Sequence, residues 1–339
     1  MNTYFHWKLA QRFVNDYKLP MPIISAEIFD YHLRLYEKEY GTLTKWNKLL
    51  GFIDNRYSGD TMDARVEQFL QEFYAVRERI ITEIPQKEAF QRFNNMDMSV
   101  FPTKKLTPKC SSLYNETNIG KFFISIDLTK GNFQALNYAD KGILEADTYD
   151  EFISKYTDIY YIAESKYFRQ VIFGKMNPSR HITVEKHIIG KVYDLFVREY
   201  GESMTLVVYN SDELIFEFTD WLAVNIELAV AEKVKNELGI NVHCEVFSLN
   251  GYNFFSERER HKRCTYFEKC RYSYPFGSEL MCIPLPYHTL IYKLHNNQMV
   301  ADGMPGEKME LGEKDYHFNY ENIDCVFNDD FYIEKIQNR

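Results

Sequence analysis

Two segments of the sequence place carboxylates where a strand ends or turns, an arrangement that could bind a metal ion. The apolar run KFFISIDL (121–128) ends near Asp127, and LVVYNSDELIFEF (206–218) carries Asp212 and Glu213 between two apolar runs. Residues of these types favour β-strands, so the second segment predicts a β-hairpin with the acids at its tip. If the first strand ends beside that tip, Asp127 and Asp212 repel unless a proton or a cation lies between them. Alternatively, the hairpin acids only hydrate a loop.

Hard oxygen ligands suit Mg²⁺ or Mn²⁺, and metal sites with few protein ligands are typical of phosphoryl transfer. The sequence therefore predicts Asp127, Asp212 and Glu213 as catalytic residues. Of these, Asp127 and Asp212 are the expected metal ligands, for one or two ions, and Glu213 is an auxiliary acid.

A predicted helix between the two acidic segments carries several basic side chains. Its start at Pro178 suits the first turn of a helix, and the pattern continues to about residue 200. At about 100° per residue, Arg180, His187 and Lys191 form one stripe opposite an apolar face. Together with Lys186, they are candidates for contacts to a nucleoside triphosphate, whose phosphates must be held and neutralised. The alternative is the solvated face of an ordinary amphipathic helix.

In this order, the three segments resemble motifs A, B and C of polymerase palm domains. FISIDLTKGNFQALN is similar to motif A, NPSRHITVEKHIIGKVY to motif B, and VVYNSDELIFEF to motif C. The Asp212-Glu213 pair is close to the Asp-Glu pair that family A DNA polymerases carry in motif C. The short distance between the second and third segments is more similar to reverse transcriptases and RNA-dependent polymerases. The hairpin reads neither YxDD nor GDD, and the resemblance covers about residues 119–250.

This resemblance implies a metal-dependent nucleotidyltransferase, polymerase-like, that uses Mg²⁺ or Mn²⁺ and acts on nucleic acid with nucleoside triphosphates. The ions held by Asp127 and Asp212 would activate a 3′-hydroxyl and stabilise the leaving pyrophosphate. In palm domains, the residue five or six positions after the motif A aspartate commonly lies under the ribose, which here means Asn132 or Phe133. Phe133 could exclude a 2′-hydroxyl, whereas Asn132 could hydrogen-bond to it. Alternatively, Phe133 belongs to the core.

Two other classes of function remain open at this stage. A metal-dependent nuclease would use the same carboxylates with water as the nucleophile. A non-catalytic, palm-shaped scaffold or assembly protein would keep the acids only as a polar loop. The missing YxDD sequence, the small size and the net charge of −9 favour the scaffold. An acidic protein can nevertheless bind polyanions through a local basic groove or through bound cations.

The periodicity along the chain predicts an α+β protein in three parts. Residues 1–118 form a helical region and a linker, in which Ser25 is a candidate N-cap. Residues 119–250 form a palm-like antiparallel sheet with covering helices. Residues 251–339 form a small mixed, β-rich region.

The composition places few limits on the cellular role. No stretch approaches the roughly 18 apolar residues of a membrane span, and the N-terminus lacks an apolar signal-peptide core, so we expect a cytoplasmic protein without a membrane partner. The six cysteines contain no CxxC pair, which favours reduced thiols. A zinc site is a weaker alternative, because the spacing C-x5-C-x11-C-x5-H does not match a zinc finger. Its ligands would be Cys264, Cys270, Cys282 and His288.

Overall fold

The computed structural model describes residues 3–218, 225–256, 262–274, 276–297, 317–320, 323–327 and 331–337. Its helices are α1 (Trp7–Tyr17), α2 (Ala26–Leu35), α3 (Glu37–Tyr40), α4 (Thr42–Arg56), α5 (Met62–Gln86), α6 (Glu88–Asn95), α7 (Gly131–Ala139), α8 (Tyr149–Ser154), α9 (Tyr160–Glu164), α10 (Lys166–Gly174), α11 (Pro178–Tyr200), α12 (Ile226–Leu238) and α13 (His288–Asn297). Its strands are β1 (Phe122–Leu128), β2 (Met204–Tyr209), β3 (Glu213–Phe218), β4 (Val242–Ser256), β5 (Lys262–Arg271), β6 (Gly277–Met281), β7 (His317–Tyr320), β8 (Ile323–Val326) and β9 (Phe331–Lys335).

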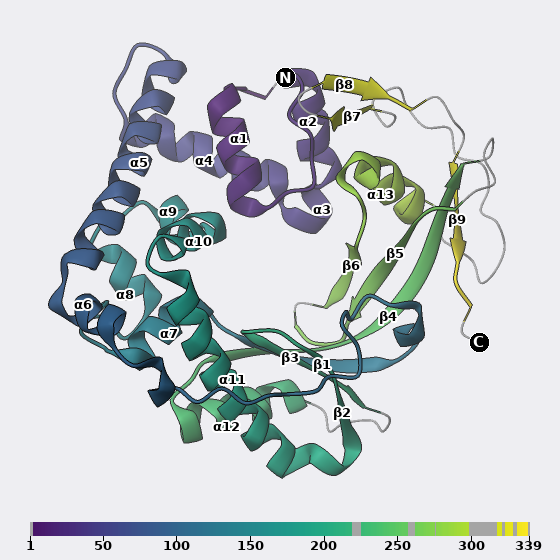
Figure 1. Ribbon diagram of the computed structural model, residues 1–339. Coiled ribbons are helices and arrows are strands. Elements are labelled where there is room, and N and C mark those ends of the chain that lie inside the picture. Colours follow the sequence, from purple (N-terminus) through teal and green to yellow (C-terminus); the bar gives the residue numbers. More distant parts are fainter. Residues whose placement is uncertain are drawn as a thin grey trace.

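The main sheet is antiparallel, with the strand order β2-β3-β1-β4-β5-β6, and β9 pairs with β4 (Figure 1). The order β1, helix, β2, β3, helix, β4 along the chain is that of a ferredoxin-like β-α-β-β-α-β unit. Both β2 and β3 come from the predicted hairpin. The predicted α+β class is therefore confirmed.

The two faces of β1 have different surroundings because successive side chains alternate across a strand. Ile124 and Ile126 are fully buried in the main core, which also includes residues of α7, α11 and α12. On the other face, Phe123 packs with Leu113 and Phe247 in a smaller cluster. The linker reaches this region by pairing with β2, where Cys110 N donates to Val207 O over 3.0 Å. By the same alternation, Asp127 lies on the face of Phe123.

The N-terminal helices follow the predicted pattern. The Ser25 side chain accepts a hydrogen bond from Ile28 N over 3.2 Å and caps α2, as expected. Phe29 and Trp46 are fully buried, with ring centroids 4.9 Å apart. Gly239 ends α12 in the left-handed conformation, at φ 69°.

The last third of the chain extends the sheet. The predicted boundary at residue 250 lies inside β4, which runs on to Ser256 and pairs with β5 and β9. This strand therefore links the two predicted parts. The helix α13 was not predicted from the sequence.

Two of the proposed zinc ligands make hydrogen bonds with other groups. His288 Nδ1 lies 2.9 Å from Tyr36 Oη, and Cys270 Sγ accepts a hydrogen bond from Asn250 Nδ2 over 3.4 Å. Across the described ranges, no group of three or more His, Cys, Asp or Glu side chains is arranged to hold a metal ion.

None of the helices in the described part of the chain is long and apolar enough to cross a membrane.

Helices α2 and α13 lie side by side although they are far apart in the sequence (Figure 1). His32 donates from Nδ1 to Ile28 O over 2.7 Å, so its neutral Nε2 accepts from Thr289 Oγ1 at 3.0 Å. Burial lowers the pKa of His32 to about 4, with a smaller opposing effect from the Ile28 carbonyl. Burial also lowers the pKa of His288 to about 4, helped by the nearby His32.

These two histidines should make the protein sensitive to acid. Their pKa values in the folded state lie below the value of about 6.5 in the unfolded chain, so the unfolded state binds more protons as the pH falls. We expect the free energy of unfolding to decrease as the pH falls from about 6.5 to 4, by about 1.4 kcal/mol per unit of pKa difference. In urea titrations across this range, His32→Leu should flatten the slope although it lowers stability overall. An unchanged slope would contradict the prediction.

Candidate functional site

The pairing of β1 with β3 brings the predicted acids to one end of the sheet. Asp127 lies opposite Glu213 in the antiparallel register, and Leu128 N donates to Asp212 O over 2.9 Å. These backbone contacts hold the end of β1 against the β2–β3 turn. The structure therefore brings Asp127 and Asp212 together.

A third carboxylate, which the sequence analysis did not select, joins them from α11. Glu185 is 3% exposed, and its Oε1 accepts a hydrogen bond from Asn132 Nδ2 over 2.8 Å. Gly131 shows how near these groups lie: a Cβ atom there would be 3.4 Å from Glu185 Oε1 and 3.7 Å from Asp212 Cβ. Thus β1, the hairpin and α11 each contribute one acid to this site.

Asp127 has an unusual protonation equilibrium. Burial, together with the negative charges of Asp212 and Glu213, raises its pKa to about 7. The positive charges of Lys166 and Lys269 act in the opposite direction but do not restore an ordinary value. At neutral pH the site therefore gains from a proton or from a cation.

Glu185 responds to the same surroundings. Burial, together with repulsion from Asp212 and, more weakly, from Asp127, raises its pKa to about 7. The hydrogen bond from Asn132 opposes the rise. Carboxylates from separate elements are thus coupled electrostatically, which is common at functional sites.

The carboxylates fit an incomplete metal site. As noted above, the described residues do not supply three side-chain ligands in a metal-binding arrangement. Mg²⁺ is commonly bound by one or two carboxylates, with water and substrate phosphates completing its octahedron. Asp127 and Asp212 supply oxygen donors of this kind.

Glu213 has a different environment from the other acids. Its Oε1 accepts from Ser125 Oγ over 2.7 Å, and its Oε2 lies 3.4 Å from Asn210 Nδ2. It therefore contributes negative charge beside Asp127 while its own oxygens are occupied within the sheet.

The predicted basic stripe on α11 makes contacts away from the acids. Arg180 donates to Met96 O, and its guanidinium lies 5.4 Å from the Phe93 ring centroid. From about 100° per residue, Glu185 lies roughly 140° around the helix from Arg180. The stripe therefore faces the linker side of α11, and a role in binding a nucleotide stays a prediction.

The two other members of the basic stripe also contact groups away from the acids. His187 Nδ1 lies 2.9 Å from Pro102 O. Lys191 Nζ donates to Tyr138 Oη over 2.6 Å, whereas Lys186 is exposed.

The two candidates for sugar contact are separated by the structure. Phe133 is 3% exposed and packs on Tyr149 and Phe152, with centroids 6.1 and 6.3 Å away. This is the core alternative, so Phe133 is not exposed to a sugar in this structure. Asn132 instead faces the carboxylates through Glu185.

A cationic cluster, also missed in the sequence, lies on the helical side of the site. Lys166 begins α10 and is near enough to lower the pKa of Asp127. Burial lowers the pKa of Lys18, and the charges of Lys166 and Arg169 lower it further, so the three cations are neighbours. Within the described residues, none of the three forms an ion pair with a carboxylate.

One signal for the third acid was present in the sequence. Glu185 falls among the apolar positions of α11, near Ile188, Ile189 and Val192, where an unpaired charge is costly to bury. The cationic cluster had no comparable signal, because Lys18 at the end of α1 is remote in sequence from Lys166 and Arg169 of α10.

Comparison with known proteins adds no relative: no protein-family model matches the chain, and no curated protein matches its sequence.

Removing one of the repelling charges should stabilise the metal-free protein. At pH 8 Asp127 and Glu185 are mostly ionised, although their raised pKa values show that the folded site favours the protonated forms. We expect Asp212→Asn to raise the free energy of unfolding by about 1 kcal/mol and to abolish Mn²⁺ binding. Urea unfolding and titration calorimetry measure the two effects. The control Asp60→Asn, at an exposed position outside the site, should change neither. Unchanged Mn²⁺ binding in both Asp127→Asn and Asp212→Asn would contradict a shared site.

Cation binding should also release protons. Because the pKa values of Asp127 and Glu185 are raised to about 7, protons compete with Mn²⁺ below that pH. We expect the affinity for Mn²⁺ to rise from pH 6 to 8, with net proton release near pH 6.5. Calorimetry in buffers of different ionisation enthalpy measures the released protons. Binding heats that do not depend on the buffer would count against this coupling.

Proposed function

We propose that the chain is a metal-dependent nucleotidyltransferase, polymerase-like, that acts on nucleic acid with nucleoside triphosphates. The observation that carries the proposal is the meeting of Asp127, Asp212 and Glu185 at one end of an antiparallel sheet. The connectivity of this sheet, with the hairpin between two helices, is also consistent with the resemblance to palm domains.

The electrostatics of the site favour a cation there over an empty acidic cluster. Asp127 and Glu185 are mostly buried, and each is subject to repulsion from other carboxylates. A divalent ion would offset that repulsion while leaving coordination positions for substrate oxygens. Asp127 and Asp212 would hold it, and Glu185 would add negative charge and orient Asn132.

The cationic cluster supports a triphosphate as the substrate. Lys18, Lys166 and Arg169 lie within electrostatic range of one another, and Lys166 also acts on Asp127. Positive side chains beside an acidic metal site suit a group that carries several negative charges. We assign the phosphate contacts to this cluster in preference to the basic stripe on α11.

In this mechanism, the residues of the chain mainly position groups and balance charge. A bound Mg²⁺ supplies Lewis-acid chemistry for the attack of a hydroxyl on a phosphoryl group. Asp127 and Asp212 would hold that ion at the tip of the sheet, where it would meet the reacting end of the triphosphate. Lys166 and Arg169 neutralise its charge, which favours the departure of pyrophosphate. Asn132 lies beside the reacting groups and can contact the sugar.

Incorporation of nucleotides tests the proposal directly. Wild-type protein should extend DNA or RNA primer-templates in Mg²⁺ or Mn²⁺, and both Asp127→Asn and Asp212→Asn should lose this activity with the fold intact. Cleavage of the strand without incorporation would identify a nuclease. Neither activity, together with no binding of Mn²⁺, would favour a scaffold.

A paired set of lysine variants tests the assignment of phosphate contacts. A charge-assisted phosphate contact contributes roughly 1.5–3 kcal/mol, so Lys166→Ala should weaken triphosphate binding about tenfold to a hundredfold. Lys191→Ala is the matched control, because that lysine is paired with Tyr138 on another face of α11. Equilibrium binding with Mn²⁺ and a non-hydrolysable triphosphate measures both. A larger loss in Lys191→Ala than in Lys166→Ala would restore the assignment made from the sequence.

Sugar selection should depend on Asn132 and not on Phe133. Asn132→Ala should change the ratio of ribonucleotide to deoxyribonucleotide use, because the side chain lies at the carboxylates. Phe133→Ala should instead lower the free energy of unfolding by about 3–5 kcal/mol, as expected for a buried aromatic ring. Single-nucleotide incorporation and urea unfolding separate the two effects. A changed ratio in a stable Phe133→Ala protein would reverse the assignment.

A further inference from the structure

The outer side of α11 and the linker that crosses it carry basic side chains that the proposed function does not use. Arg180 donates to Met96 O, and His187 Nδ1 lies 2.9 Å from Pro102 O, so the linker runs along the helix in the same direction. Figure 1 shows this segment passing over α11 on its way from α6 to β1. We call it the outer basic surface, and its basic side chains are Arg180, Lys186, His187 and Lys191 of α11 and Lys105 of the linker.

A glycine lets the linker lie close to the helix. Gly190 is buried, and a Cβ atom there would be 3.3 Å from Lys104 Cβ, which is closer than most contacts of Cβ atoms. At about 100° per residue, Lys186 lies roughly 40° from Gly190 on one side, and Lys191 lies roughly 100° from it on the other. The two lysines therefore flank the linker. Both are exposed, as is Lys105.

Three carboxylates near this surface are bound by other groups. Asp194 pairs with Lys104, and Glu237 pairs with Arg198 over 2.7 Å. Asp97, at the start of the linker, accepts hydrogen bonds from the backbone and the hydroxyl of the serine two positions later, over 3.0 and 2.6 Å. Across the ranges that the structure describes, none of the basic side chains of the outer basic surface forms an ion pair with a carboxylate.

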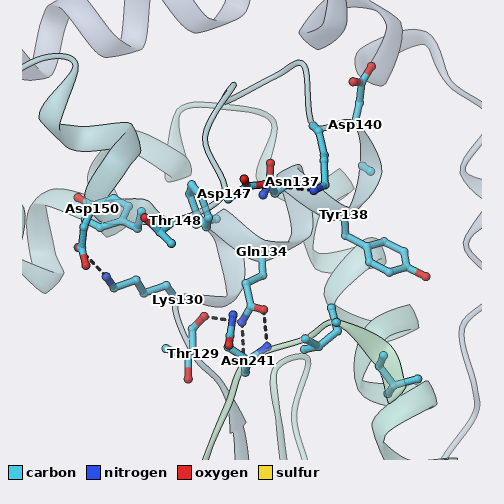
Figure 2. A pocket seen from close by; sticks show the side chains of 17 residues that line it. Thr129, Lys130, Gln134, Asn137, Tyr138, Asp140, Asp147, Thr148, Asp150 and Asn241 are labelled. Carbon is cyan, nitrogen blue, oxygen red and sulfur yellow. Dashed lines mark hydrogen bonds and ion pairs between the residues drawn. The ribbon is translucent and has the colours of Figure 1, made fainter. Parts of the chain in front are cut away.

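A lysine on the neighbouring side of α7 shows the contrast. Tyr138 lines a pocket there, together with Lys130 and Asp150. In this pocket Lys130 Nζ donates to Asp150 Oδ1 over 2.9 Å, so the two charges offset each other (Figure 2). Lys191 Nζ instead donates to the uncharged hydroxyl of Tyr138 over 2.6 Å. Its charge therefore stays available to an anionic ligand, in a protein whose net charge is −9.

The arrangement of these charges suits a linear polyanion. Arg180 and Lys191 are separated by about 17 Å along the helix, from a rise of about 1.5 Å per residue. One strand of a DNA duplex carries a phosphate about every 3.4 Å along the axis, so about five phosphates span this distance. A helix that binds an anionic membrane needs a free apolar face to insert, whereas the apolar face of α11 is buried in the protein core. The surface therefore fits nucleic acid better than lipid.

We propose that the outer basic surface binds the sugar-phosphate backbone of a nucleic-acid duplex without reading its bases. The ammonium groups of the exposed lysines contact phosphate oxygens, and the release of counterions from the backbone favours this binding. Glu185 lies about 140° around α11 from Arg180, so the duplex is held on the side of the helix away from the carboxylates. The inference goes beyond the proposed function and does not require the carboxylate site to be catalytic.

Removal of three exposed lysines tests the proposal. The triple variant Lys105→Gln, Lys186→Gln and Lys191→Gln should bind a short DNA duplex of mixed sequence about tenfold to a hundredfold more weakly than the wild type. The slope of log K against log [salt] should become shallower by about 2–3, because three phosphate contacts are lost. Fluorescence anisotropy in EDTA measures both without a divalent ion at the carboxylate site. Equal affinity of the variant and the wild type, or no binding of the duplex by the wild type, would overturn the proposal.

Two further variants locate the effect. The control for net charge replaces by glutamine three exposed lysines on α1, α3 and α4, namely Lys8, Lys38 and Lys48. It should bind the duplex nearly as the wild type does, and a loss equal to that of the triple variant would overturn a local surface. Asp212→Asn should also retain duplex binding in EDTA, which separates failure of this inference from failure of the proposed function. Loss of duplex binding in Asp212→Asn would assign the nucleic acid to the carboxylate site and overturn the inference.

A measurement on the wild type needs no variant. The duplex should protect Lys105, Lys186 and Lys191 from acetylation by acetic anhydride, and it should leave Lys8 reactive, as read by mass spectrometry. A second duplex of unrelated sequence should give the same protection, since backbone contacts carry no sequence information. Vesicles that contain phosphatidylserine are the second probe and should not protect these lysines. Protection by the vesicles but not by the duplex would identify a lipid-binding surface and overturn the proposal.

Discussion

Backbone hydrogen bonding between β1 and the β2–β3 hairpin holds carboxylates together that would otherwise separate. Residues of β1 pair on one side with β3 and on the other with β4, so its position is fixed from both edges. The bond from Leu128 N to Asp212 O continues this pairing past the strand end. The apolar faces of the sheet supply the free energy that offsets the repulsion. The acidic site therefore exists because the ladder and the core are stronger than the charges.

The third acid depends on a different element, since α11 buries one face against the sheet and carries Glu185 with it. Ile188, Ile189 and Val192 on that face are almost fully buried. A carboxylate placed among them loses hydration, and a single hydrogen bond from Asn132 replaces only part of it. A structural role alone would be served by an amide, which carries no charge to bury. The buried carboxyl group is consistent with a site that receives a cation.

Local patterns in the sequence predicted the elements, and long-range packing decided what they face. The hairpin, α11 and the Ser25 cap follow from residue types within a few positions, and all three were predicted. The basic stripe of α11 was also predicted, but its contact with the linker at Pro102 joins residues that are remote in the sequence. Periodicity cannot show which segment covers a helix face. For the same reason, the sequence alone did not distinguish the roles of Asn132 and Phe133, which differ in the contacts that each makes in the structure.

The C-terminal elements show another limit. The strands β5 and β6 extend the sheet beyond residue 250, and α13 returns to α2 through His288 and Tyr36. The contact between α13 and α2 joins positions separated by most of the chain, and no local pattern encodes it. The cationic cluster has the same origin, because its lysines and its arginine come from α10 and from the end of α1.

A buried ion pair joins the N-terminal helix α1 to the segment that carries Lys166. Arg12 and Asp16 pair over 2.9 Å and are both almost fully buried. Asp16 also accepts from Ser165 Oγ and from Tyr161 Oη, each over 2.8 Å, so α1 is joined to the start of α10. The next residue is Lys166, whose charge acts on Asp127. Truncating one partner of this ion pair would leave the other charge buried and unpaired, which would lower the free energy of unfolding although no residue of the cationic cluster is changed. Helix α1 is thus joined to the residue that precedes Lys166 through one short polar network.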